Sequence, residues 1–406
     1  MQAPVSLYIV HHPACDRAAV VARSLYDWFR LGYLSGDQSG AGLPVHYRRQ
    51  LDEQGALLPS IDFEGAALNV VIVLVDEKLV VCPKWRSAVV ALAQSLNNLR
   101  YASPKQAAAG STSILIPAAM HDSFYRTGPL YEGFNPIRLI GMENDAMERT
   151  LRRSVTEATA RAIRGEGFES PPPLNVFLSH AKKDGQEIAK SIRDGVRNFG
   201  QLVAWYDAND LPYGAAWESP MERAAGTDTA AMIVTMTDTY PTRPWCRKEA
   251  QLARTPKRLE KPKGSQVWRV QPVVAVHQPG TSWVRGVPML DGVPRIGWKP
   301  HEAIDMTEQI VDRLVLEVLL GLVHRKVALN LEKTTTNKSK SCYITWVPDA
   351  WTLASLRREM GRKASSIDRI VYPGYGLTAA EIEELRPVLE TFKRDTRLVS
   401  FEEVMP

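Results

Sequence analysis

The residues best placed to do chemistry lie in one short stretch, Pro241–Ala253, and above all in the pair Trp245 and Glu249. Pro244 suits the first turn of a helix, where its missing N–H costs nothing. Residues four apart share one helix face, so we expect the indole and the carboxylate to point the same way. An indole excludes water and holds a flat ring by stacking. The pair indicates a ligand pocket, although a half-buried tryptophan beside a solvated glutamate shows the same pattern.

The elements that must position this pair follow a strand–helix rhythm. The run Asn69–Val75 is apolar on both faces, which is typical of parallel sheets covered by helices on both sides. Amphipathic stretches with helical spacing separate such runs. The fold class is therefore α/β, with flavodoxin-like parallel sheets flanked by helices. The other runs that we expect to be buried strands are 5–10, 112–117, 175–179, 231–235 and 270–276.

Composition shifts divide the chain into three domains. We expect a first domain at 1–164, a proline-rich linker at 165–173, and a second domain at 174–325. A polar linker at 326–340 then leads to a small βαβαβ unit at 341–406. The first two domains correspond step by step at a spacing of roughly 160 to 170 residues, which indicates an internal duplication. The alternative is that any two α/β domains share this rhythm.

Charge and cysteine usage narrow the class of protein. The 406 residues carry a formal net charge of +5, with a basic run between Arg243 and Lys263. Such a run attracts a nucleotide or nucleic acid, or is a solvated face with a loop, which we favour. The four cysteines lack paired spacing, so no zinc or disulfide framework is expected. We find neither a secretory signal nor a membrane span, and expect a cytoplasmic protein.

Four motifs of the second domain resemble the Toll/interleukin-1 receptor (TIR) domain family. The first resembles the opening strand of that family, and the second resembles its second strand with a terminal Asp. The third resembles the long loop that follows, and the fourth is similar to the Trp-x-x-x-Glu helix. In this sequence they are Val176–His180, Trp205–Asp207, Leu211–Trp217 and Trp245–Glu249.

The resemblance implies an activity and a site. Enzymatic members cleave the bond between nicotinamide and ribose in NAD+, with a glutamate that corresponds to Glu249. NAD+ is then a substrate, and neither a cofactor nor a metal is expected. Breaking a glycosidic bond builds positive charge on the ribose, which a fixed carboxylate stabilises. The residues expected to contact substrate are Ser179, His180, Asp207, Trp217 and Trp245.

Each of these contacts has a plainer alternative. Ser179 and Asp207 are also suited to capping turns, His180 to a surface position, and Trp217 to a core. The sequence departs from some hydrolytic members, which carry arginines just after the first strand. Lys182 and Lys183 stand there instead and lack the planar guanidinium fork.

The first domain departs further from the family pattern. Four residues after Trp85 stands Val89, and the first strand ends in His11 and His12 without a serine. If Glu249 is the catalytic carboxylate, this copy cannot do the same chemistry. We therefore expect a degenerate TIR-like pseudo-enzyme domain. The two histidines lack partners at ligand spacing, so we do not expect them to bind a metal.

The resemblance implies a bacterial anti-phage effector that cleaves NAD+ and is activated by self-association through TIR domains. A separate sensor or effector protein is a candidate partner. A non-catalytic TIR adaptor is the alternative, in which the Trp-x-x-x-Glu helix is structural. A nucleoside deoxyribosyl transferase, which uses similar glutamate chemistry, fits a duplicated TIR-like pattern less well.

Overall fold

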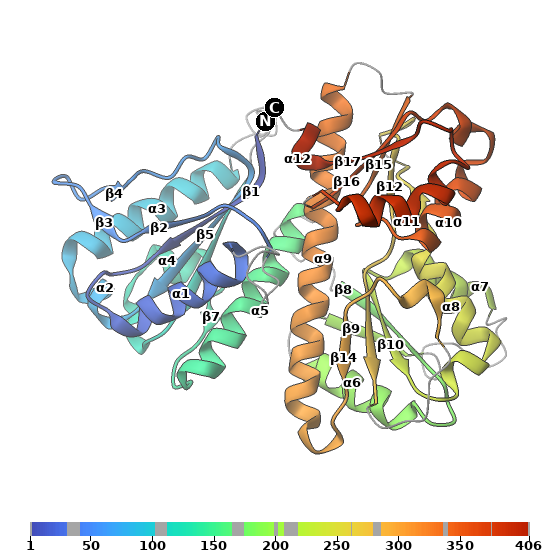
Figure 1. The fold of residues 1–406 in the computed structure, drawn as a ribbon. Helices are drawn as coiled ribbons and strands as arrows, with labels where there is room; N and C mark the ends of the chain where they lie inside the picture. The colour runs from blue at the N-terminus through green and yellow to red at the C-terminus, as the bar shows by residue number, and fades with distance from the viewer. Residues whose placement is uncertain are drawn as a thin grey trace. The chain divides into compact units, whose positions relative to one another are not determined.

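A computed structural model describes residues 2–30, 41–101, 112–164, 174–198, 202–206, 218–260, 262–278, 286–335, 340–374 and 376–404. The chain divides into two compact units, unit 1 at 1–169 and unit 2 at 170–406. Figure 1 shows both units, each built from sheets with helices against them. None of the helices in the described ranges is long and apolar enough to cross a membrane.

Unit 1 is built on a parallel five-stranded sheet with the order β2-β1-β5-β6-β7. The central strand β5 is buried along almost its whole length, as its apolar run predicts. A short hairpin, β3 and β4, follows β2. The strands are β1 (Ala3–Val10), β2 (Val45–Arg48), β3 (Gln50–Leu51), β4 (Leu57–Leu58), β5 (Ala66–Val75), β6 (Thr112–Ala119) and β7 (Ile137–Arg138). The helices are α1 (Asp16–Arg30), α2 (Glu77–Val81), α3 (Pro83–Tyr101), α4 (Pro129–Gly133) and α5 (Asn144–Ile163).

Unit 2 begins with a second parallel sheet, in the order β14-β13-β10-β8-β9. When the five strands of each sheet are numbered from 1 to 5 in chain order, both sheets have the spatial order 2-1-3-4-5. This is the flavodoxin-like arrangement. The predicted fold class is confirmed, but many unrelated domains share this order. The strands are β8 (Leu174–His180), β9 (Leu202–Tyr206), β10 (Ala231–Met236), β13 (Val273–His277) and β14 (Arg295–Gly297). The helices are α6 (Gln186–Asn198), α7 (Glu218–Arg223), α8 (Pro244–Arg254) and α9 (Ala303–Thr334).

A third sheet joins the end of the chain to the middle of it. Its order is β11-β12-β15-β16-β17, and the strands and helices after residue 340 alternate as predicted. The first two strands come from the segment between α8 and β13. The first of them falls within the basic run, where the sequence favoured a solvated face with a loop, and that prediction is wrong for Lys257 and Arg258, which are half-buried in a strand. The elements are β11 (Lys257–Arg258), β12 (Val267–Arg269), β15 (Ser341–Ile344), α10 (Ala350–Met360), β16 (Arg369–Tyr372), α11 (Ala379–Leu389), β17 (Arg397–Ser400) and α12 (Phe401–Val404).

Helix α9 contacts both sheets of unit 2 and runs past them in Figure 1. The sequence predicted a linker at 326–340, but the helix continues to Thr334. The linker prediction is therefore wrong for residues 326–334. The extra turns bury Val327, Ala328 and Leu331 against Tyr343 of the third sheet. Burial of this apolar face stabilises the helix beyond the predicted end.

Candidate active site

The site is organised at the carboxyl end of β8. Ser179 and His180 are the last two residues of the strand and are 1% and 7% exposed. The neighbouring strand β10 pairs with them in parallel, with Val234 opposite Ser179. Open α/β sheets bind their ligands at this carboxyl edge, so the strand places both side chains where ligand chemistry is expected.

Helix α8 brings the predicted carboxylate to the same edge. Pro244 occupies the first turn, as predicted, and Glu249 follows Trp245 by one helical turn. Ser179 Oγ donates a hydrogen bond to Glu249 Oε2 at 2.5 Å. The Glu249 side chain is 5% exposed, so the carboxylate lies inside the domain and not in bulk solvent. The contact fixes the carboxyl group against the end of β8.

Tyr240, which the sequence did not single out, completes a chain of contacts with this pair. Its phenol oxygen lies 2.7 Å from Ser179 Oγ and donates to the Cys246 carbonyl oxygen at 3.0 Å. The Tyr240 ring is fully buried. Burial and the negative charge of Glu249 raise the pKa of Tyr240 well above its usual value, so the phenol remains a donor.

Asp184 connects the loop after β8 to the loop after β10, which leads to Tyr240. The carboxylate of Asp184, in the turn after β8, accepts hydrogen bonds from the loop after β10. Thr237 Oγ1 donates at 2.6 Å and the Thr239 backbone N–H at 3.0 Å. Burial alone would raise the pKa of Asp184, but these hydrogen bonds outweigh it and lower the pKa. The ionised carboxylate holds the loop that carries Tyr240.

Trp245 is half-buried beside the carboxylate and packs against the core of the domain. The Lys248 ammonium lies 4.5 Å from the centre of its ring, and the same nitrogen is 2.5 Å from Glu222 Oε1. One face of the indole is therefore covered by a cation. Only the remaining surface of Trp245 is open to the stacking role that the sequence predicted.

The other predicted contacts have mixed outcomes. His180 is buried, which excludes the surface alternative, and its carbonyl oxygen accepts a weak hydrogen bond from Cys246 Sγ at 3.5 Å. Lys182 and Lys183 are exposed in the turn after β8. Asp207 and Trp217, with the loop between them, lie outside the described residues.

The carboxyl end of α8 is anchored to the third sheet. Arg254 is 6% exposed, and its Nη2 lies 2.9 Å from Asp349 Oδ2 at the N-cap of α10. Lys257 and Arg258 follow in β11, and Arg258 Nη2 donates to the Gly264 carbonyl oxygen at 2.8 Å. The basic run is thus divided among an ion pair, a strand and a loop. The helix that carries Glu249 is held at both ends.

This arrangement suits a reaction that develops positive charge. A buried carboxyl group is fixed by a hydroxyl at the carboxyl edge of a parallel sheet, with an indole one turn away. A fixed group stabilises a charged transition state without reorganising at the moment of reaction. Glycosidic bond cleavage, which passes through a cationic sugar, is chemistry of this kind.

Comparison with known proteins agrees with this class of site. Residues 176–306 match the family model described as TIR domain, so this segment is a TIR domain. A stretch of 110 residues is 27% identical to the NAD(+) hydrolase PdTIR of Paracoccus denitrificans (strain Pd 1222). The match covers 27% of this chain and 36% of that relative, so the chain spans about a third of its length. The family match lies within unit 2, and the TIR-like copy in unit 1 stays a prediction.

Proposed function

We propose that the TIR domain cleaves NAD+ between nicotinamide and ribose, giving nicotinamide and ADP-ribose or a cyclic ADP-ribose. One observation carries the proposal. A buried glutamate, Glu249, is fixed by Ser179 at the ligand-binding edge of a domain that is similar to a protein named as an NAD(+) hydrolase. The buried carboxyl group is the feature that links the fold to the chemistry.

The proposed chemistry assigns Glu249 to the ribose. As the glycosidic bond breaks, the bonding electron pair stays with the pyridinium nitrogen, and nicotinamide leaves as a neutral molecule. The positive charge left on the ribose is stabilised by the Glu249 carboxylate. Water adds to the ribose cation and releases a proton, or a ring nitrogen of the adenine adds instead and closes the cyclic product. Trp245 borders the site, and His180, Asp207 and Trp217 remain proposed substrate contacts.

We propose that self-association activates this site. Glu249 is 5% exposed in the single chain, so a ribose needs the surrounding segments to move before it reaches the carboxylate. Contact with a neighbouring TIR domain is a means of stabilising an open arrangement. An NAD+-cleaving effector that acts when assembled suits anti-phage defence, with a separate sensor protein as the trigger.

A non-catalytic adaptor is the second candidate, and one observation favours it. The contacts among Glu249, Ser179, Tyr240 and Cys246 fasten α8 to β8 whether or not a substrate binds. A glutamate that serves only this purpose needs no access to a ligand. In that case the domain acts through its surface alone.

We further propose that unit 1 is a pseudo-enzyme that packs on, orients or restrains the active domain. Its sheet has the same strand order as the TIR sheet, and Trp85 opens α3 as Trp245 opens α8. Val89, at the position that corresponds to Glu249, is 1% exposed and belongs to the apolar core. Without a carboxylate there, unit 1 cannot perform the proposed step.

The test is nicotinamide release from NAD+ by the full chain, at high protein concentration or with a crowding agent. Glu249→Ala and Glu249→Gln are expected to abolish release while the protein stays folded. Release by wild type that rises steeply with protein concentration supports activation by assembly. No release by wild type under any assembly condition supports the adaptor.

A further inference from the structure

A cavity of about 470 Å³ lies in unit 1, apart from the TIR domain. Its lining comes from the segments that follow three neighbouring strands. Pro13 follows β1, and Trp85 lies in the first turn of α3, after β5. The segment just after β2 contributes Arg49, Gln50 and Leu51. The cavity is therefore at the carboxyl edge of the first sheet, where strand order reverses around β1. Ligands of open α/β sheets bind at this place, and the volume is typical of a small-molecule site.

The side-chain donors around this cavity have no acceptor in the described part of the chain. The Arg49 guanidinium is exposed and makes no ion pair or hydrogen bond there. The exposed Gln50 carboxamide and the indole N–H of the buried Trp85 also have no acceptor in the described part of the chain. Arginine is the residue best suited to bind a phosphate, because its planar fork makes two parallel hydrogen bonds. An exposed guanidinium beside further donors is available to an anionic ligand, which replaces the water on these groups.

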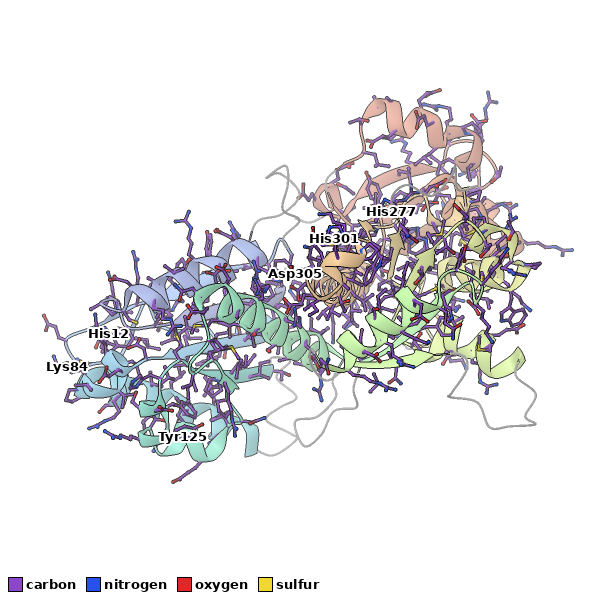
Figure 2. The ribbon with its side chains drawn as sticks, turned by 90° about the horizontal axis from the view of Figure 1, so that it is seen from below. His12, Lys84, Tyr125, His277, His301 and Asp305 are labelled. Atoms are coloured by element: carbon purple, nitrogen blue, oxygen red, sulfur yellow. The ribbon has the colours of Figure 1, made fainter. Side chains whose placement is uncertain are left out.

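The charge around the cavity favours the same ligand. Trp85 stands in the first turn of α3, whose amino end carries a partial positive charge, and Lys84 beside it is exposed. Figure 2 shows Lys84 and His12 at the same end of unit 1. The nearby acid Asp76 is 5% exposed and caps α2, accepting a hydrogen bond from the Leu79 N–H at 2.9 Å.

The walls of the cavity are suited to a flat ring. The Trp85 ring lines the cavity, and Pro13 and Leu51 add apolar surface. The His12 ring packs against Trp85 with the ring centres 5.5 Å apart. The turn that holds His12 is braced, because the Ala14 N–H donates to His12 Nδ1 at 3.1 Å and Lys78 Nζ donates to the Ala14 carbonyl. The Trp85 ring offers a surface for a base, and the Arg49 and Gln50 side chains beside it offer donors for a phosphate.

We propose that this cavity binds a nucleotide, with its phosphate on Arg49 and Gln50 and its base against the Trp85 side. The site is separate from the NAD+ site proposed in the TIR domain and does not depend on it. Unit 1 then contributes ligand recognition to a chain whose second unit carries the proposed chemistry.

Isothermal titration of the full chain with ADP tests the proposal, with adenosine as the probe that lacks phosphate. We expect saturable ADP binding, at least tenfold weaker binding of adenosine, and about 10- to 100-fold weaker ADP binding in Arg49→Ala. Gln50→Glu places a negative charge beside the phosphate and is expected to weaken binding as well. Arg126→Ala, an exposed arginine of the same unit, is the matched control and leaves affinity unchanged.

Several outcomes overturn the proposal. The first is no heat of binding at millimolar ADP, and the second is equal affinity for ADP and adenosine. The third is affinity that neither Arg49→Ala nor Gln50→Glu alters. ADP binding that Ser179→Ala abolishes and Arg49→Ala leaves intact places the nucleotide in the TIR domain instead. None of these results depends on NAD+ cleavage, so the two proposals fail separately.

Discussion

Replacing Asp349 by asparagine removes one charge from the contact that anchors α8 to the third sheet. Asp349 Oδ2 lies 2.9 Å from Arg254 Nη2, and Asp349 Oδ1 caps α10 by accepting from the Thr352 N–H at 2.8 Å. Asparagine is as good an N-cap as aspartate, so Asp349→Asn keeps the cap and removes only the charge. The variant therefore isolates the ion pair.

The expected loss of stability follows from the burial of the two partners. The Arg254 side chain is 7% exposed and that of Asp349 is 30% exposed. Removing one partner of a fully buried pair costs about 3–5 kcal/mol, and an exposed pair contributes about 0–1 kcal/mol. Glu317 also acts on Arg254 and compensates part of its charge. We therefore expect Asp349→Asn to lower the free energy of unfolding of unit 2 by about 2–3 kcal/mol.

Urea unfolding followed by tryptophan fluorescence and circular dichroism measures this loss, as a lower midpoint at constant slope. Asp291→Asn breaks an exposed pair with Arg295 in the same unit and is the matched control, with an expected change below about 0.5 kcal/mol. Combining Asp349→Asn with Arg254→Met is expected to give a coupling energy of about 1–3 kcal/mol. Equal, small losses in Asp349→Asn and Asp291→Asn would refute the anchoring role.

Two further predictions concern titration and the buried contacts of the site. Burial lowers the pKa of His324 from its usual 6.5 to about 4, so the unfolded chain takes up the proton first and stability falls as pH drops from about 6.5 to about 4. From urea unfolding, the free energies of unfolding at pH 7.5 and pH 5 are expected to differ by about 1–2 kcal/mol more in wild type than in His324→Gln. Tyr240→Phe removes the hydroxyl between Ser179 and the Cys246 carbonyl and is expected to lower the free energy of unfolding by about 1–3 kcal/mol in the same assay. A loss below about 0.5 kcal/mol would contradict the role given to that hydroxyl.

The strands were predictable because their residues are buried on both faces. A strand such as β5 lies between helices on both sides of its sheet, so its apolar run shows in the sequence without any knowledge of its neighbours. The same holds for β10, β13 and the alternating elements after residue 340. Their places in the sheets follow from the parallel pairing that such runs require.

The features that the sequence did not reveal depend on distant partners. Lys257 and Arg258 look like part of a solvated run until β12 pairs with β15, more than seventy positions later. Arg254 is equally ordinary in sequence, because its partner Asp349 lies 95 residues away. Helix α9 outlasts its predicted end because the third sheet covers its last turns. Tertiary packing overrides local pattern in all three places.

The residues of the candidate active site also include some that the sequence revealed and some that it did not. The spacing of Trp245 and Glu249 set them one turn apart on a helix, and the end of β8 placed Ser179 at the sheet edge. Tyr240 has no such signal, because it lies in a short turn between β10 and α8. Its position over Ser179 depends on the hydrogen bonds that Asp184 makes to that turn. Such contacts between loops follow no periodicity that a sequence displays.

The most direct test of the central claim is the initial rate of nicotinamide release by Glu249→Gln. Glutamine has almost the same shape and keeps a hydrogen-bonding group toward Ser179 Oγ, so the fold is retained while the charge is lost. Glu187→Gln, the same change at an exposed position of α6, is the matched control. The account predicts a rate at least about 100-fold lower in Glu249→Gln and unchanged in Glu187→Gln. Equal rates in the two variants would contradict it.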